Sequence, residues 1–441
     1  MLERLFKLKE NGTTPRTELI AGATTFMAMA YIIFVNPAIL SSSVGAGMEF
    51  RAVMAATCIA SAIATLLMAF LANYPIALAP GMGLNAYFSF VLCGKMGVPW
   101  NIALGIVFIS GVVFTILTVA RVRELIVTAI PGNLKLATAA GIGLFIAFLG
   151  LKDAGIIESD PAAYLTLGDL HRPETLLALF GLLLTGTLMA AKVRGGIFWG
   201  ILGTGAVGLA TRMISFHGVF SMPTLEPTLF KMDPIGALRW EYLTPIFVFL
   251  FFDMFDTVGT LIGVGEQAGF MKGGKLPRVN RALLSDSVGT MVGAAVGTST
   301  TTSYVESVAG VSAGGRTGLA NLMTAGLFLI ALFFSPLAEM FGGGFEIAPG
   351  IFLHPVTAPA LVIVGCLMMK CIVKIDWDDY SEAIPAFLTL IIMPLTSSIA
   401  HGLAIGFISY PLIKAFSGHA REVHWLVYLL AVLFVLRYIL I

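Results

Sequence analysis

Acidic side chains interrupt two of the most apolar stretches of the sequence. Asp253 and Asp256 lie in the run FDMFDTVGT, and Glu306 follows a series of hydroxyl residues. Near the centre of a membrane-spanning helix an aspartate costs roughly 2.5–3.5 kcal/mol on insertion scales, so three carboxyl groups cost on the order of 8–10 kcal/mol. No lysine or arginine in the same stretches offers a salt bridge. A site that binds hydrogen-bond donors or protons therefore explains these residues better than a structural ion pair.

The spacing of the polar residues in the first stretch predicts a single polar face. Positions i, i+3, i+4 and i+7, which share one side of an α-helix, are occupied by Asp253, Asp256, Thr257 and Thr260. Carboxylates accept hydrogen bonds, whereas threonine and serine hydroxyls both donate and accept them. Such a face suits a small, planar, neutral molecule that carries both N–H groups and carbonyl oxygens.

The same carboxyl groups are candidates for carrying a transported proton. Removal from water favours the neutral, protonated form of a carboxyl group, so we expect Asp256, Glu306 and Asp253 to take part in proton coupling. For Asp253, an equal alternative is a structural hydrogen bond with Thr25 or with a hydroxyl near Glu306. Asp286 follows a basic cluster and is instead expected to form an interfacial ion pair.

The composition places these residues in a polytopic membrane protein. Of the 441 residues, 58% are hydrophobic and 12% are charged, which is about half the charged share of a soluble domain. The net charge of +1 provides no basic surface for nucleic acid. Neither an H-E-x-x-H motif nor a set of clustered His and Cys residues indicates a metal site or an enzyme, and no cofactor is expected. Since one spanning helix takes roughly 20 residues, the chain can supply on the order of a dozen spans.

Apolar segments separated by charged residues, proline or glycine predict an all-α protein with fourteen membrane crossings. The expected segments are 18–40, 52–72, 76–93, 101–120, 134–151, 173–191, 196–214, 242–268, 279–296, 298–313, 317–338, 350–373, 383–398 and 400–416. The apolar tail 423–440 is either a fifteenth span or a helix in the plane of the membrane.

Two of these segments, 76–93 and 298–313, have compositions that an ordinary spanning helix does not tolerate. The first contains Pro-Gly-Met-Gly, and the second begins with six consecutive hydroxyl residues, from Thr298 to Ser303. We expect each to be an extended piece followed by a half-helix, because irregular backbone at membrane depth is tolerated only where protein buries it or a cavity adjoins it. They are the third and tenth segments, which is the third in each of two seven-span halves. Such paired interruptions indicate an inverted repeat with a midplane substrate site in a secondary transporter.

The distribution of basic residues predicts the orientation of the chain. With a cytoplasmic N-terminus, alternating spans place Arg121, Arg123, Lys192 and Lys272 in cytoplasmic loops, whereas the loop 217–241 lies on the opposite side. We therefore expect a multi-pass protein of the plasma membrane (the inner membrane if the source is bacterial), surrounded by lipid. Whether it forms a homodimer is left open.

Four motifs of the chain resemble those of a known transporter family. They are AGATTFMAMAYIIFVNP (21–37), APGMGLNA (79–86), FDMFDTVGT (252–260) and TTTSYVES (300–307). They resemble the xanthine/uracil permease superfamily of nucleobase:cation symporters, and more closely its AzgA-like branch of adenine, guanine and hypoxanthine permeases. The resemblance extends over about residues 10–420.

The resemblance implies fourteen spans in a 7+7 inverted repeat, with short strands leading into half-helices at spans three and ten. It also implies a core domain and a gate domain, each built from both repeats. After the cytoplasmic N-terminus (1–17), the boundaries are 18–120 and 241–340 for the core, and 121–240 and 341–441 for the gate.

The resemblance also assigns roles to individual residues. The family's base-binding carboxylates correspond to Asp256 and Glu306, and Thr260 stands where the uracil branch has a histidine. Asn85 and Leu84 lie where span three lines the family's pocket. The full set expected to bind substrate is Asp256, Glu306, Thr260, Asn85, Leu84, Thr25 and Ser307.

The expected function is import of purine nucleobases (hypoxanthine, guanine or adenine) by proton symport, with alternating access of core against gate. Sodium coupling is the less favoured alternative. The sequence after Glu306 lacks the Asn-x-Gly signature of the xanthine branch. This difference favours a purine whose hydrogen-bonding edge differs from that of xanthine. An anion transporter of the same fold is the alternative function, and Glu306 argues against it. A membrane enzyme would need a nucleophile–base pair, which the sequence does not show.

Overall fold

The computed structural model describes residues 2–120, 129–162, 164–271, 276–348 and 351–440. Contacts between segments divide the chain into two units. Unit 1 comprises Met1–Val119 and Leu151–Ala360, and unit 2 comprises Ala120–Gly150 and Leu361–Ile441. This division does not test the functional division into core and gate domains, which stays a prediction. Of the residues expected in cytoplasmic loops, Arg121, Arg123 and Lys272 lie outside the described residues.

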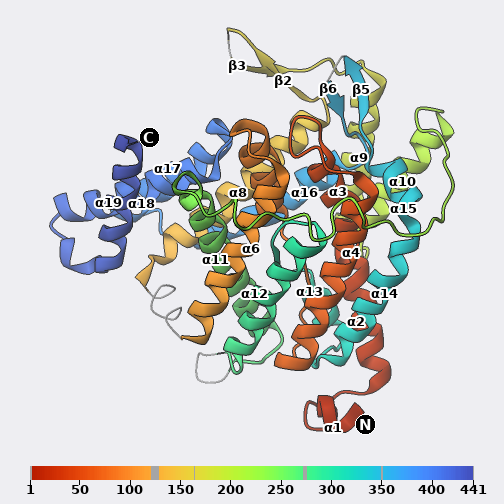
Figure 1. The fold of residues 1–441 in the computed structure, drawn as a ribbon, viewed down its shortest axis with the longest axis horizontal. Coiled ribbons are helices and arrows are strands. Elements are labelled where there is room, and N and C mark those ends of the chain that lie inside the picture. Colours follow the sequence, from red (N-terminus) through yellow and green to blue (C-terminus); the bar gives the residue numbers. More distant parts are fainter. Residues whose placement is uncertain (1, 121–128, 163, 272–275, 349–350, 441) are drawn as a thin grey trace. The chain divides into compact units, whose positions relative to one another are not determined.

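Unit 1 contains most of the helices and all of the strands of the described residues (Figure 1). Its first part has α1 (Leu2–Phe6), α2 (Pro15–Met29), α3 (Ile32–Ser41), α4 (Phe50–Leu67), β1 (Leu78–Pro80), α5 (Met82–Ala86) and α6 (Trp100–Val119). Its second part has β2 (Ile157–Asp160), β3 (Tyr164–Leu167), α9 (Pro173–Ala190), α10 (Gly196–Ala210), α11 (Leu243–Gln267), α12 (Val279–Val296), β4 (Thr301–Ser303), α13 (Ser307–Ser312), α14 (Leu319–Ala331), α15 (Ser335–Gly342), β5 (Phe345–Ala348) and β6 (Ile351–Leu353). Two π-helical segments, Met68–Ala72 and Tyr87–Lys95, continue α4 and α5.

Small residues let the helices of unit 1 approach closely around α4. α4 packs against α3, α12 and α14, and α14 also packs against α2, so that α2, α4, α12 and α14 lie side by side in Figure 1. A Cβ atom on Gly22 of α2 would collide with the carbonyl oxygen of Ala320 on α14. Small residues at helix interfaces are the usual means by which membrane helices pack.

The first expected span is two helices rather than one. The sequence predicted a helix over 18–40, but α2 ends at Met29 and α3 begins at Ile32, with Tyr31 as its N-cap. Because β-branched and aromatic residues continue on both sides of this break, the sequence gives no turn signal there. The break directs Tyr31 into the interior, where it is 1% exposed.

The two segments with unusual composition form the expected strands and half-helices. β1 and β4 pair antiparallel, with Leu78 opposite Ser303 and Pro80 opposite Thr301. The chain continues from β1 into α5 and from β4 into α13. All residues of both strands are buried, so these strands are enclosed by protein, as irregular backbone at membrane depth requires.

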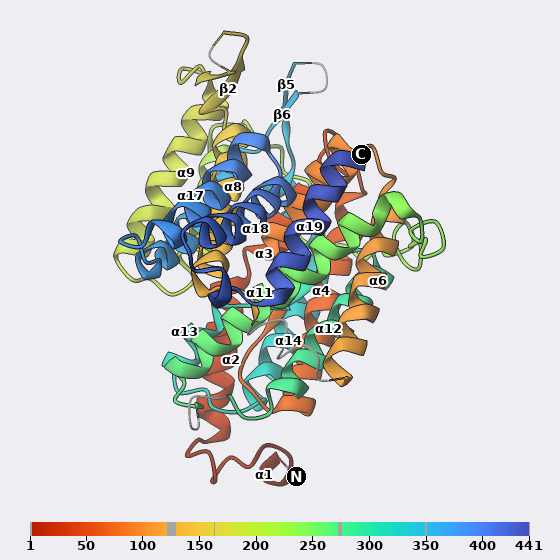
Figure 2. The ribbon, with the colours of Figure 1, turned by 90° about the vertical axis from the view of Figure 1, so that its left-hand side faces the viewer.

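Two β-hairpins were not expected from the sequence. β2 pairs with β3, and β5 pairs with β6 through a bulge between Glu346 and Ala348; both hairpins project from the helices (Figure 2). The helix expected over 350–373 is therefore wrong in its first part, because β6 occupies its start and α16 (Ala358–Met368) begins only at Ala358. The apolar run of β6 reads equally well as strand or helix when only hydrophobicity is considered.

Unit 2 is built from most of α8 (Gly132–Asp153), most of α16, α17 (Tyr380–Thr396), α18 (Ile399–Phe416) and α19 (Trp425–Leu440). α17 packs against α18, and α18 against α19, so the apolar tail is a helix. Lys414 on α18 lies among three carboxylates, 3.1 Å from Glu382 and 3.4 Å from Asp379, with Glu422 at 3.7 Å. Hydrogen bonds from the side chain and backbone of Ser381 hold the pKa of the Asp379 carboxyl group below its usual range.

Eight helical stretches of the described residues are long and apolar enough to cross a membrane. They are Pro15–Ser41, Phe50–Ala72, Trp100–Val119, Gly132–Asp153, Pro173–Ala190, Trp240–Gln267, Leu319–Gly342 and Ile399–Phe416. Shorter apolar helices such as Gly196–Ala210 and Tyr380–Thr396 accompany them. The chain is thus a multi-pass membrane protein.

Candidate substrate-binding site

Side chains from neighbouring helices satisfy the backbone of the paired strands. The hydroxyl of Thr65 on α4 is 3.0 Å from both the amide nitrogen and the carbonyl oxygen of Leu78. The amide of Asn321 on α14 donates to the carbonyl oxygens of Tyr74 and Ile76, just before β1. Since unpaired backbone groups are costly in a buried position, these bonds fix β1, the strand that leads into α5 and pairs with β4.

Glu306 lies at the junction between β4 and α13, where it is the N-cap residue of α13. It is partly exposed. The hydroxyl of Tyr31 donates to Glu306 Oε1 at 2.5 Å, which is the length expected for an O–H group bound to a carboxylate. The sequence placed Glu306 in the site and did not identify Tyr31.

Asp256 approaches Glu306 from α11. The hydroxyl of Thr302 in β4 hydrogen-bonds the Asp256 carboxyl group, and the charges of Asp256 and Glu306 lie close enough to interact. Asp256 is also partly exposed. The two expected base-binding carboxylates, which are 50 positions apart in the sequence (306 − 256), therefore lie in one cluster.

The polar residues of α11 contact two different neighbouring elements, α12 and β4. Asp253 and Thr257 face α12, where Thr290 donates to Asp253 Oδ2 at 3.2 Å and Thr257 donates to Asp286 Oδ1 at 2.8 Å. Asp253 therefore has a partner on α12, and the hydrogen bond expected with Thr25 or with a hydroxyl near Glu306 stays a prediction. Asp286 is 0% exposed, and the interfacial ion pair expected for it stays a prediction.

Asn85 is a buried amide near the start of the first half-helix. Its side chain is 0% exposed, and neither its nitrogen nor its oxygen has a hydrogen-bond partner among the described residues. Leaving both atoms of a buried amide unpaired is rare, because each costs about 1–3 kcal/mol. α5, which carries Asn85, packs against α11, as do β4 and α13. This arrangement is the one expected of a residue that hydrogen-bonds a ligand.

The remaining candidates surround this cluster in different ways. Ser307 accepts a hydrogen bond from the backbone of Ala77 at 3.0 Å. Thr25 is 2% exposed and contacts α13, where a Cβ atom on Gly310 would collide with its hydroxyl. Leu84 is buried in α5, and Thr260 is partly exposed one turn beyond Asp256. Thr25 and Ser307 thus hold the half-helix in place, and their contact with substrate stays a prediction.

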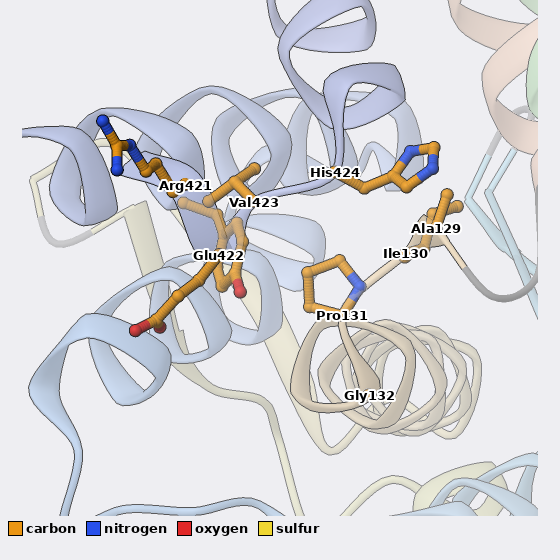
Figure 3. Close-up of a pocket in the computed structure, with 9 residues that line it drawn as sticks. Ala129, Ile130, Pro131, Gly132, Arg421, Glu422, Val423 and His424 are labelled. Atoms are coloured by element: carbon orange, nitrogen blue, oxygen red, sulfur yellow. The ribbon is translucent and has the colours of Figure 1, made fainter. Parts of the chain in front are cut away.

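A separate cavity of about 470 Å³ lies in unit 2. It is lined by Ala129–Gly132 at the start of α8, by Tyr410, and by Arg421–His424 (Figure 3). It contains none of the candidate residues. Among the described residues, no group of three or more His, Cys, Asp or Glu side chains is arranged to hold a metal ion.

The fold and the buried polar cluster define a membrane transporter built on a 7+7 inverted repeat. The transmembrane domain of the cyanobacterial bicarbonate transporter BicA superposes with a TM-score of 0.64, at 16% identity, over 88% of this chain and 97% of that one. The murine anion transporter Slc26a9 gives a TM-score of 0.62 at 11% identity, over 91% of this chain and 68% of that one. At these identities the likeness shows the fold, and it confirms the predicted fold class.

The chain belongs to the xanthine/uracil permease family, whose model, described as "Permease family", matches residues 16–405. Guanine/hypoxanthine permease PbuO of Bacillus subtilis is 47% identical over 98% of this chain and 99% of its own length. Guanine/hypoxanthine permease PbuG of the same organism is 46% identical over 99% of both chains. Adenine permease AdeQ of Escherichia coli is 41% identical over 100% of this chain and 96% of its own length. The resemblance seen in the motifs is confirmed, and the protein is a permease rather than an enzyme.

Proposed function

We propose that this permease carries purine nucleobases across the membrane. The observation that carries the proposal is the proximity of Asp256 on α11 to Glu306 at the start of α13, together with the unpaired amide of Asn85 on α5, a helix that packs against α11. Two carboxylates accept N–H groups, and the amide both donates and accepts. A purine offers N–H groups and acceptor atoms around one planar ring system, so it matches this set. Guanine, hypoxanthine and adenine are the bases in the names of the relatives.

Proton symport is the proposed mode of coupling. Thr290 lies between two acceptors, Asp253 Oδ2 at 3.2 Å and the carbonyl oxygen of Thr301 at 3.0 Å. A hydroxyl has one hydrogen and can donate to only one of them. A proton bound to Asp253 would let Asp253 donate to Thr290 and Thr290 donate to Thr301. Proton binding on α11 would then act on β4, the strand that leads to Glu306.

Alternating access requires that the binding cluster face each side of the membrane in turn. We propose that the core domain, which carries Asp256 and Glu306, moves against the gate domain. The proposed setting is the plasma membrane, with the N-terminus in the cytoplasm. A homodimer stays a prediction.

Anion transport is the less favoured alternative. The solved relatives BicA and Slc26a9 are named as bicarbonate and anion transporters, but at 16% and 11% identity they support the fold alone. Asp256 and Glu306 would repel an anion unless both were protonated. The pair of carboxylates therefore favours a neutral ligand.

Uptake in cells that lack their own purine permeases tests this function. We expect cells that express the chain to accumulate radiolabelled hypoxanthine, guanine or adenine, and an uncoupler to abolish the accumulation. Sodium-driven uptake that an uncoupler leaves unchanged would contradict proton symport. The absence of uptake of all three bases by correctly inserted protein would contradict purine transport itself.

A further inference from the structure

Tyr31 forms a short hydrogen bond at the candidate site, and none of the motifs gave it a role. Its hydroxyl donates to Glu306 Oε1 at 2.5 Å, and the residue is 1% exposed. Glu306 has two carboxylate oxygens, and one of them is therefore already bound within the protein. The hydroxyl of Tyr31 bonds Oε1 and leaves the other oxygen, Oε2, outside this hydrogen bond.

The break in the first span holds Tyr31 in this position. Tyr31 is the N-cap of α3, and the backbone N–H groups of Phe34 and Val35 both donate to its carbonyl oxygen at 3.0 Å. Buried side chains in packed surroundings keep a single rotamer. The hydroxyl is thus a fixed part of the site, directed at Glu306 before any ligand binds.

We propose that Tyr31 is a specificity-determining residue, because its hydroxyl occupies one oxygen of the Glu306 carboxylate and leaves the other oxygen to bind the base. This inference rests on the proposed function, because it takes Glu306 as a group that binds the base. An oxygen that accepts a short hydrogen bond has less electron density for a second donor, so Oε2 is the oxygen that Glu306 offers to a base. One N–H group satisfies Oε2, whereas two adjacent N–H groups need both oxygens.

Purine bases differ in the donors that they present along one edge. Hypoxanthine has a single N–H group at N1 beside its carbonyl group. Guanine has N1–H and an adjacent amino group, which match the two oxygens of a free carboxylate as a pair. At Glu306, Tyr31 therefore favours hypoxanthine, which presents one N–H group on this edge, over guanine, which presents two adjacent N–H groups.

The test is the ratio of two dissociation constants in the variant Tyr31→Phe, which loses the hydroxyl and keeps the ring. Guanine and hypoxanthine are titrated into the purified full-length protein by calorimetry. We expect the Kd of guanine relative to that of hypoxanthine to fall about tenfold in the variant, the factor that corresponds to about 1.4 kcal/mol, or one hydrogen bond. Equal changes in both constants would show that Tyr31 only supports the fold, and would refute the inference.

Tyr410→Phe is the matched control. Tyr410 in unit 2 donates to Glu382 Oε1 at 3.0 Å, so it forms the same type of tyrosine–glutamate pair outside the candidate site. Both variants lose a hydrogen bond to a carboxylate, and thermal unfolding of each reports the general cost. The ratio of the two constants should change in Tyr31→Phe alone, and the same change in Tyr410→Phe would count against the inference.

A second measurement needs no variant. 1-Methylhypoxanthine lacks the N1–H group, and loss of a donor to a charged acceptor weakens binding about 10- to 150-fold. We expect it to displace hypoxanthine from the unmodified protein at least tenfold less well than hypoxanthine itself. If it competes equally while both parent bases bind, the inference about Tyr31 fails and purine binding stands. If neither parent base binds, the proposed function fails.

Discussion

At the scale of single residues, one helix carries polar groups with different neighbours. Successive residues of an α-helix are 100° apart, so Asp256 and Thr257 point in clearly different directions although both belong to one broad face. Asp253 and Thr257 are one turn apart and both bond to α12, whereas Asp256 bonds to Thr302 of β4. The spacing of these residues in the sequence predicts that they share one face. Only the packing of α12 and β4 against α11 determines which of them bond to α12 and which to β4.

The two carboxylates of the cluster should both be required for binding. Loss of a charged acceptor for a buried donor costs roughly 1.5–3 kcal/mol. We expect Glu306→Gln and Asp256→Asn each to weaken purine binding at least about tenfold in titrations of purified protein. Thr260→Ala should have a smaller effect, since the net contribution of a neutral hydrogen bond is about 1 kcal/mol. Undiminished binding of all three bases by Glu306→Gln would show that the site is elsewhere.

At the scale of elements, α13 packs against α2, which holds it in position. Gly310 of α13 lies against α2, where a Cβ atom would stand 2.6 Å from the carbonyl oxygen of Ala21. Further along, Glu18 of α2 is 0% exposed and accepts hydrogen bonds from the backbone of Arg316 at 2.8 Å and Ala320 at 3.2 Å. These contacts hold α13 and the chain that follows it against α2.

The close contact at Gly310 predicts a strong effect of a single methyl group. Gly310→Ala would force α13 away from α2 and move Glu306, so we expect lower thermal stability and a loss of purine binding. Gly326→Ala on α14 is the matched control, because nothing lies within 4 Å of its added Cβ atom, and replacing a helical glycine there should raise stability by about 0.5–1 kcal/mol. Thermal unfolding and binding titrations compare the two variants. Normal binding by Gly310→Ala would show that α13 does not need this contact.

The sequence predicted the two strands and half-helices because their composition is incompatible with a spanning helix. Pro80 and the hydroxyl run before Ser303 indicated extended backbone, and their matched places in two halves predicted an inverted repeat with a midplane substrate site, whereas the pairing of β1 with β4 is visible only in the structure. Tyr31 could not be found in this way, since no proline or glycine marks the break between Met29 and Ile32. The β5–β6 hairpin was missed because a short apolar run is compatible with either secondary structure. Asn85 was identified through the family motif, and its unpaired amide is visible only in the structure.

At the scale of the whole molecule, the sequence carries two kinds of information that do not depend on each other. Paired interruptions at the third and tenth segments predict the inverted repeat, and this fold is confirmed by its likeness to BicA. The basic residues predict which side of the membrane each loop faces. Because each repeat has an odd number of spans, the second repeat enters the membrane from the opposite side to the first. Once the side of the membrane on which the N-terminus lies is known, the side of every loop in both halves follows.

The orientation of the chain is therefore testable at two loop positions. We expect a cysteine at position 226, between α10 and α11, to react with a membrane-impermeant maleimide added to intact cells. A cysteine at Lys192, between α9 and α10, should react only after permeabilisation, because basic loops stay in the cytoplasm. The background for both variants replaces Cys366 and Cys371, which are not buried, while Cys58 and Cys93 are shielded within the protein. Labelling of position 192 from outside, with position 226 protected, would reverse the orientation. The same result would leave the inverted repeat intact, because it is defined by the fold and not by the side from which the chain enters.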